Sequence, residues 1–148
     1  MEREHREIDG GIEAFVEKLD RGSIQPEPLT AALDALRRHI YIEEVFLFPP
    51  VRDAGLAMPV FVMLREHGEL WQTMDALADL LAAGTDSERL RDACLKLLDQ
   101  LNRHNSKEEP VIYPHADADL TPQVRAQAVR FIENGRFPKG WVCQQADR

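Results

Sequence analysis

Six residues of this chain have the types and spacing of metal ligands, because the sequence repeats one short pattern. His39 is followed by Glu43 at offset four, and His104 is followed by Glu108 at the same offset. Both copies continue with a second glutamate, an aromatic residue at offset nine and a proline at offset ten. Imidazole and carboxylate groups together suit iron, manganese or zinc, so the repeat predicts a metal centre.

Two further histidines stand upstream of the repeated pairs, also in matching contexts. Glu4-His5 precedes Ile8 in one copy, and Glu66-His67 precedes Leu70 in the other. Four of the five histidines therefore belong to two copies of one arrangement, and only His115 stands outside it. The predicted metal ligands are His5, His39, Glu43, His67, His104 and Glu108.

The apolar residues recur at helical spacing, and no segment shows the alternation of a strand. Helices must therefore position these side chains. We expect helices over residues 2–20, 28–48, 59–83 and 86–109, with the second ending at Pro49-Pro50 and the fourth broken or bent at Pro110. Thr85 to Glu88 indicates a capping box, and Thr121-Pro122 indicates a short fifth helix ending near residue 134. The predicted fold is all-α, an up-down-up-down four-helix bundle over about 1–116. The short helix and a docking tail, over about 117–148, would complete a single domain that spans residues 1–148.

Helical phase places every predicted ligand on the core-facing stripe of its helix. His5 and His67 lie near the starts of their helices, and His39 and His104 lie near the ends of theirs. In an antiparallel bundle these positions fall at one level. A buried carboxylate without a partner costs several kcal/mol, and a bound cation would offset that cost.

Simpler interpretations exist for each residue taken alone. A lone buried histidine is more often a hydrogen-bonded core residue, and one His-x-x-x-Glu pair is more often a surface ion pair. Here six such residues lie on the core-facing sides of their helices and occur in two copies of one pattern. This combination favours a metal centre over a core histidine or a surface ion pair. Glu44 and Glu109 point about 100° away from the paired glutamates, so we expect them to support the ligands or face solvent. His115 is expected at the surface or in a loop.

Composition argues against several other classes. The net charge of −8 is unsuited to nonspecific nucleic-acid binding. No apolar run approaches the length of a membrane-spanning helix, and the charged N-terminus lacks the apolar region of a signal peptide. Cys94 and Cys143 fit neither a disulfide framework nor a zinc knuckle, and Cys94 is expected in the core. A cytoplasmic location without a membrane partner is the resulting expectation.

At these residues the chain resembles the hemerythrin-like family, also called the HHE cation-binding domain, over about residues 1–116. The resemblance rests on the Glu-His pairs of the first and third helices, on the His-x-x-x-Glu-Glu-x-x-Leu-Phe-Pro segment from His39, and on the His-x-x-x-Glu-Glu segment from His104. It implies a four-helix bundle holding an oxo- or hydroxo-bridged pair of iron ions. By this resemblance one iron takes His5 and His39, the other takes His67 and His104, and Glu43 and Glu108 bridge them.

The sequence departs from the oxygen-carrying members in two places. Those proteins have a further histidine four residues after the third-helix histidine, where this chain has Trp71, and an aspartate at offset five from the last histidine, where it has Glu109. We therefore expect a non-haem di-iron protein that binds or reacts with O₂, peroxide or nitric oxide, in sensing, scavenging or iron handling. Manganese or zinc could take the place of iron.

Two alternatives to this function remain open, and a third is discounted. The first is a reversible oxygen carrier or store, and the second is a metal-free helical interaction module. The third is a ferritin-type di-iron oxidase, which needs Glu-x-x-His pairs on two helices. Here only Glu2 and His5 have that spacing.

Overall fold

The computed structural model describes residues 1–84 and 86–146, and all regular secondary structure in these ranges is helical. This confirms the predicted all-α class. The elements in chain order are α1 (Glu2–Asp20), α2 (Pro26–Ile42), the π-helix η1 (Glu43–Leu47), α3 (Phe48–Asp53), α4 (Ala57–Ala82), α5 (Ser87–Asp119) and α6 (Pro122–Asn134). No helix in the described ranges is long and apolar enough to span a membrane.

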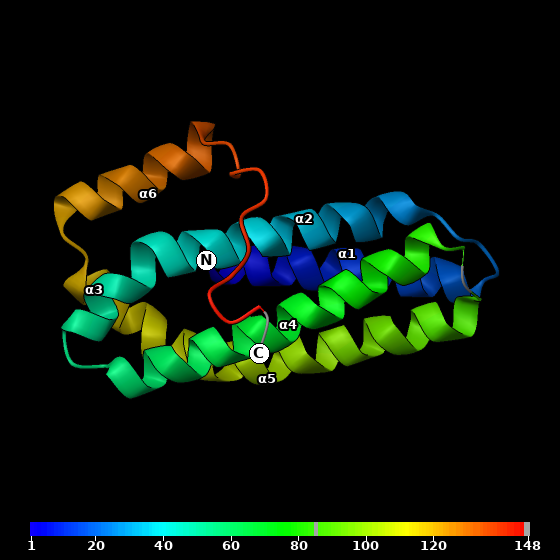
Figure 1. Ribbon diagram of the computed structural model, residues 1–148, viewed down its shortest axis with the longest axis horizontal. Helices are drawn as coiled ribbons and strands as arrows, with labels where there is room; N and C mark the ends of the chain where they lie inside the picture. The colour runs from blue at the N-terminus through cyan, green and yellow to red at the C-terminus, as the bar shows by residue number, and fades with distance from the viewer. Residues whose placement is uncertain (85, 147–148) are drawn as a thin grey trace.

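The long helices α1, α2, α4 and α5 lie side by side as a four-helix bundle (Figure 1). Contacts join α1 to α2, α4 to α5, α1 to α5, and α2 to α4. Two groups of buried apolar residues fill the interior. On α4, Leu64 belongs to one group and Leu70 to the other, with His67 between them; on α5, Leu101 and Ile112 likewise belong to different groups. The predicted ligands therefore lie between two apolar layers.

The second helix does not end at Pro49-Pro50, so that expectation was wrong. Its last turn becomes the π-helix η1, and the backbone N–H of Phe48 donates to the carbonyl of Glu43, five residues back. Pro49 and Pro50 then occupy the first turn of α3, where a helix needs no backbone donor. Helical structure continues through both prolines to Asp53.

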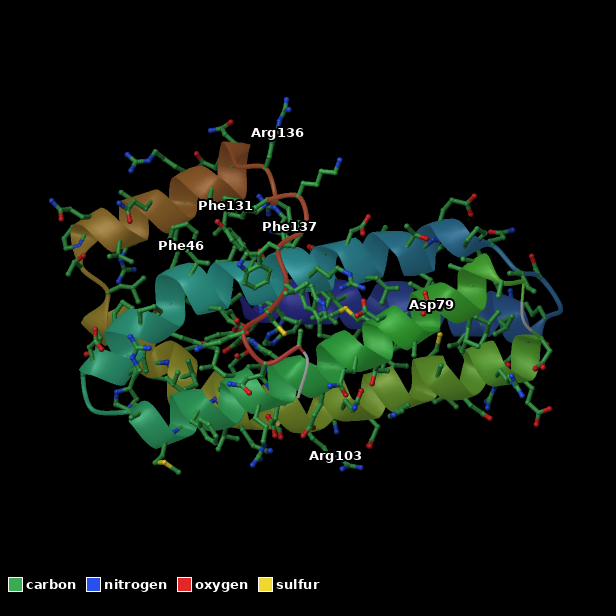
Figure 2. The ribbon with its side chains drawn as sticks, viewed as in Figure 1. Phe46, Asp79, Arg103, Phe131, Arg136 and Phe137 are labelled. Carbon is green, nitrogen blue, oxygen red and sulfur yellow. The ribbon has the colours of Figure 1, made fainter. Side chains whose placement is uncertain are left out.

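The extra residue of the π-turn also changes which side chains face the core. In a regular α-helix Phe46, seven residues after His39, would share its buried face, yet Phe46 is only partly buried, whereas Leu47 and Phe48 are buried. Phe46 instead packs against Phe131 of α6, with ring centroids 5.9 Å apart, and Figure 2 shows the two side chains meeting between α6 and α2. One inserted residue turns the following side chains by about 100°, which accounts for the change.

The fourth helix also runs further than expected. It continues through Pro110 and Pro114 to Asp119, so of the two outcomes expected at Pro110, a break or a bend, the break is not found. Each proline removes one backbone donor. Burial of the last turns against α3 and α4, including Ile112 and Ala116, compensates for that loss.

Two helix starts follow the chemistry of their capping residues. Asp86 accepts a hydrogen bond from the backbone N–H of Arg89 at 3.0 Å and caps α5, whereas the predicted cap, Thr85, lies outside the described residues. Thr121 caps α6 by accepting from the N–H of Val124 at 3.2 Å, as predicted. Helix α4 begins at Ala57, two residues before the expected Pro59.

After α6, the segment 135–146 returns across α2 and α4, drawn in orange and red in Figure 1. Trp141 packs edge-on against Tyr41 and Trp71, with ring centroids 5.1 and 5.7 Å apart. Cys143 is buried here, and Cys94 is buried in the bundle core as expected. The segment therefore covers the outer faces of α2 and α4.

Candidate metal centre

The structure brings all six predicted ligands together inside the bundle. Their exposed fractions range from 0% to 4%. They form two groups in which the candidate ligand atoms lie within 4.8 Å of one another. The first group is His5, His39, Glu43 and Glu108, and the second is Glu43, His67, His104 and Glu108.

The first group is built around the Nε2 atoms of His5 and His39, which lie 2.9 Å apart. His5 Nε2 is 3.2 Å from Glu108 Oε1, and His39 Nε2 is 3.4 Å from Glu43 Oε2. Helices α1, α2 and α5 and the π-helix each supply one of these side chains. All four polar atoms thus face a common point between the helices.

The second group uses the other oxygen of each carboxylate. His67 Nε2 is 3.1 Å from Glu43 Oε1 and 4.0 Å from Glu108 Oε2, and His104 Nε2 is 3.3 Å from Glu108 Oε2. Glu43 and Glu108 therefore present one oxygen to each group, which is the arrangement of two bridging carboxylates.

Three buried atoms of the second group have no hydrogen-bond partner among the described residues: Glu43 Oε1, Glu108 Oε2 and His67 Nε2. His67 Nε2 and Glu43 Oε1 are close but poorly aligned for a hydrogen bond. Buried polar groups normally find partners, and a carboxylate left without one is costly. Imidazole nitrogen and carboxylate oxygen atoms that lie close together without forming hydrogen bonds are typical of ligands that point toward a shared metal ion. The residues present therefore fit a metal-binding centre.

Each of the four histidines is held from behind by its own carboxylate. Since a carboxylate only accepts, each Nδ1 must carry the proton, and each Nε2 is left facing the centre. This is the usual support of a metal-binding histidine. The Nδ1 partners are Glu109 for His5 (2.8 Å), Glu4 for His39 (2.5 Å), Glu44 for His67 (2.7 Å) and Glu66 for His104 (3.0 Å).

Glu44 and Glu109 thus each accept a hydrogen bond from a candidate ligand, which agrees with one of the two roles expected for them. The roles of Glu4 and Glu66 were missed, although a signal was present: each directly precedes a predicted ligand in the repeated Glu-His pair. Glu69 is exposed. His115 is exposed as expected, but on helix α5 rather than in a loop.

Carboxylates dominate the electrostatics of the centre. Burial lowers the pKa of His39, but the Glu43 carboxylate and the hydrogen bond with Glu4 outweigh it and raise that pKa to about 10. Burial likewise lowers the pKa of His104, but Glu108 and Glu66 outweigh it and raise that pKa to about 10. Burial alone would raise the pKa of Glu43, yet His39 and His67 hold it well below its ordinary value. Without a metal, the centre therefore attracts protons in place of cations.

Tyr113 is a further residue of the centre that was not predicted as a ligand. Its hydroxyl lies 2.8 Å from Glu43 Oε2, 2.9 Å from Glu108 Oε1 and 2.9 Å from His5 Nε2. Burial and the Glu43 and Glu108 carboxylates raise the pKa of this phenol. The available signal was the aromatic residue at offset nine of the repeat.

Trp71 does not take the place of a ligand. Its indole ring lies beneath the guanidinium of Arg37, 4.6 Å from the ring centroid, and meets Trp141 edge-on. The position that carries an additional histidine in oxygen carriers is therefore occupied here by a packing residue of the bundle and its C-terminal segment.

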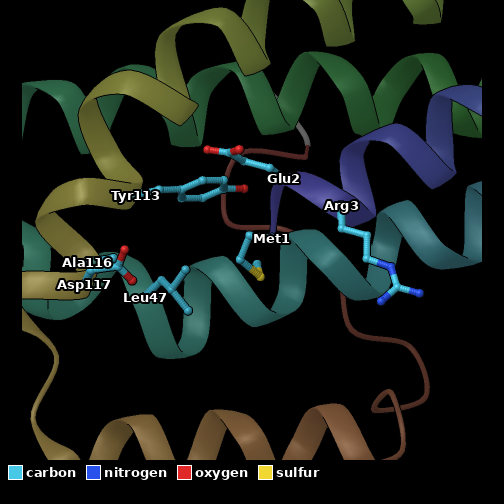
Figure 3. Close-up of a pocket in the computed structure, with 7 residues that line it drawn as sticks. All are labelled: Met1, Glu2, Arg3, Leu47, Tyr113, Ala116 and Asp117. Carbon is cyan, nitrogen blue, oxygen red and sulfur yellow. The ribbon is translucent and has the colours of Figure 1, made fainter.

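A cavity of about 320 Å³ opens beside the first ligand group, at the end of the bundle (Figure 3). It lies between the start of α1, the π-helix and the last turns of α5, and Tyr113 forms part of its wall. Its other lining residues are Met1, Glu2, Arg3, Leu47, Ala116 and Asp117. The Tyr113 side chain thus separates this cavity from the candidate ligands.

Comparison with known proteins agrees with this geometry. The family model of the hemerythrin HHE cation-binding domain matches residues 1–116. The comparisons with curated proteins and with solved structures gave no match. The matched region contains all six candidate ligands and most of the chain. This chain therefore belongs to the hemerythrin HHE cation-binding domain family.

Proposed function

We propose that this protein holds two iron ions and that the pair binds or reacts with O₂, peroxide or nitric oxide. The observation that carries the proposal is the sharing of Glu43 and Glu108, each with one oxygen in each ligand group. Two groups joined by two carboxylates suit a pair of ions better than one. His5 and His39 would hold the first ion, and His67 and His104 the second. Iron bound there would supply redox chemistry that the side chains lack.

Burial of the ligands supports a substrate of only a few atoms. The six side chains are at most 4% exposed, and apolar residues lie on both sides of them along the bundle. Phe48 stacks on the His67 ring, with centroids 5.3 Å apart, so the second group has an apolar neighbour. Diatomic gases and peroxide fit such surroundings, whereas larger organic substrates do not.

Reaction is favoured over reversible oxygen carriage because of the ligand count. Each ion would receive two imidazoles and two shared carboxylates from the six candidate ligands, and Trp71 provides no third imidazole on the second ion. Coordination positions then remain for solvent or substrate, as in reactive rather than sealed metal sites.

The test begins with protein expressed in iron-supplemented medium. Elemental analysis should give two iron ions per chain, and an oxygen-bridged ferric pair should absorb in the near ultraviolet. The anaerobically reduced protein is then mixed with O₂, peroxide or nitric oxide in separate experiments. At least one reagent should be consumed irreversibly, with the iron ending in the ferric state.

Each alternative predicts a different result. O₂ that is taken up and then recovered on purging with argon would support an oxygen carrier and contradict the preference for reaction over reversible carriage. Protein that takes up neither iron, manganese nor zinc would support the metal-free interaction module. Two tightly bound zinc or manganese ions, with no iron retained, would contradict the iron assignment alone.

A further inference from the structure

The Tyr113 hydroxyl lies among the atoms of the first ligand group rather than behind them. Four candidate ligand atoms surround it: His5 Nε2 at 2.9 Å, His39 Nε2 at 3.2 Å, Glu43 Oε2 at 2.8 Å and Glu108 Oε1 at 2.9 Å. A phenol has one proton to donate and two lone pairs, so it can satisfy three hydrogen-bonding neighbours at most. Hydrogen bonding alone does not account for this position.

The same distances match the geometry of an octahedral ion. Ligands about 2.1 Å from such an ion stand about 3 Å from their neighbours. The separations of His5 from His39, of His39 from Glu43 and of His5 from Glu108 are 2.9, 3.4 and 3.2 Å. The Tyr113 oxygen is a near neighbour of all four atoms, so it occupies the apex above them. An ion among the four atoms would lie about 2 Å from this oxygen.

Within residues 1–84 and 86–146, the second ligand group has no equivalent phenol oxygen. Phe48 stands at the same place in the repeat as Tyr113, nine residues after the helix histidine. It stacks on His67 at 5.3 Å and 20°, much as Tyr113 stacks on His5 at 5.6 Å and 29°. The two halves are therefore alike in shape, but only the first offers a phenol oxygen.

We propose that Tyr113 is a ligand of the ion held by His5 and His39, and that this makes the two ions chemically different. This inference rests on the proposed function. As the oxygen–metal bond forms, the phenol O–H bond breaks and the proton passes to solvent in the adjoining cavity. The first ion then has five protein donors and is closed on the cavity side. Substrate binding is thereby left to the second ion, beside the Phe48 ring.

The test is the colour of the ferric protein. A tyrosine bound to iron(III) produces a charge-transfer band in the visible region, and excitation in that band enhances tyrosine ring modes in the resonance Raman spectrum. Wild-type protein should show both, and ring-deuterated tyrosine should shift the Raman lines. The Tyr113→Phe variant should lose the visible band while keeping two iron ions per chain.

The chain offers a matched control, because Tyr41 is its only other tyrosine. Tyr41 packs against Phe131 and Trp141, so Tyr41→Phe should leave the visible band unchanged. A di-iron wild-type protein without the band, or a band that survives Tyr113→Phe, would overturn the inference but leave the proposed function standing. Protein that binds no iron would refute both. The isotope shift in wild-type protein decides the matter even if Tyr113→Phe fails to fold.

Discussion

The backbone N–H of Gln144 donates a 2.9 Å hydrogen bond to Glu44 Oε1, while Glu44 Oε2 accepts from Nδ1 of His67. The C-terminal segment is thus two hydrogen bonds away from the second ligand group. This segment lies outside the region matched by the family model. The structure therefore connects a segment beyond the matched region with one half of the candidate centre.

Gly68 permits the close approach that this connection needs. A Cβ atom at Gly68 would lie 2.3 Å from the backbone oxygen of Gln145, so Gly68→Ala must displace the segment. We expect a lower melting temperature and about tenfold weaker binding of the ion at the second ligand group, since loss of such supporting contacts typically costs 10–100-fold in affinity. Thermal melts and iron titrations measure both effects.

Gly10→Ala is the matched control for this substitution. Gly10 lies in the first helix, and in the described part of the chain no atom outside its own helix backbone and adjacent residues stands within 4 Å of an added Cβ atom. The change should stabilise the protein by up to about 1 kcal/mol, because alanine is the better helix former. Similar metal affinities in the Gly68→Ala and Gly10→Ala variants would show that the segment does not support the centre.

Removal of Glu66 should weaken metal binding without removing a ligand. Glu66 accepts from His104 Nδ1 at 3.0 Å and also pairs with Lys107. Glu66→Ala leaves the His104 ring free to rotate, and we expect a 10–100-fold loss of affinity for iron. The control is Glu69→Ala, which removes an exposed carboxylate on the same helix and should change affinity by less than about twofold. Metal-buffered titrations compare the two, and equal losses would contradict the role given to Glu66.

The proximity of the six candidate ligands could be predicted from the sequence, because it depends only on helical phase and on position along each helix. Residues four apart face the same way, and alternate helices in an antiparallel bundle bring starts and ends to one level. Contacts from distant parts of the chain were beyond such reasoning. The hydrogen bond from Gln144 to Glu44 joins residues a hundred positions apart, and no local pattern encodes it.

Helix ends were less predictable because tertiary packing overrides local propensity. Pro49 and Pro50 normally stop a helix, but the π-turn at Glu43–Leu47 places them where no backbone donor is needed. Pro110 is tolerated where the following turns are buried. The same π-turn carries Glu43 and Glu44, so the irregular segment positions one carboxylate shared by both ligand groups and one that accepts a hydrogen bond from His67.

Loss of metal should destabilise the fold. Binding free energy acts as folding free energy when the unfolded chain lacks the site, so chelation should lower the melting temperature by several degrees or more. Glu43→Ala and Glu108→Ala should reduce the metal content below two ions per chain, as elemental analysis would show. His115→Ala should keep both ions, because His115 is exposed and away from the centre. Equal metal loss in all three variants would mean that the ligand assignment is wrong.

The metal-free protein should lose stability as the pH rises above neutrality. His39 and His104 have pKa values of about 10 in the folded chain, against an ordinary value of 6.5. The folded state thus binds these protons more tightly than the unfolded state does. The resulting stabilisation is fully present below pH 6.5 and is lost as the pH approaches 10. We expect the melting temperature of chelated protein to fall steadily over that interval.

Two comparisons isolate the cause of this pH dependence. Metal-loaded protein should show a smaller fall, because its imidazoles bind the ion through Nε2 and carry no extra proton. His39→Gln should flatten the profile of the chelated protein, whereas His115→Gln should not change it, since His115 is exposed. Melts recorded by circular dichroism from pH 6 to 10 would measure all four profiles. The melting temperature of chelated wild-type protein could instead stay level or rise over this interval. That result would show that the carboxylates around His39 and His104 do not keep these imidazoles protonated.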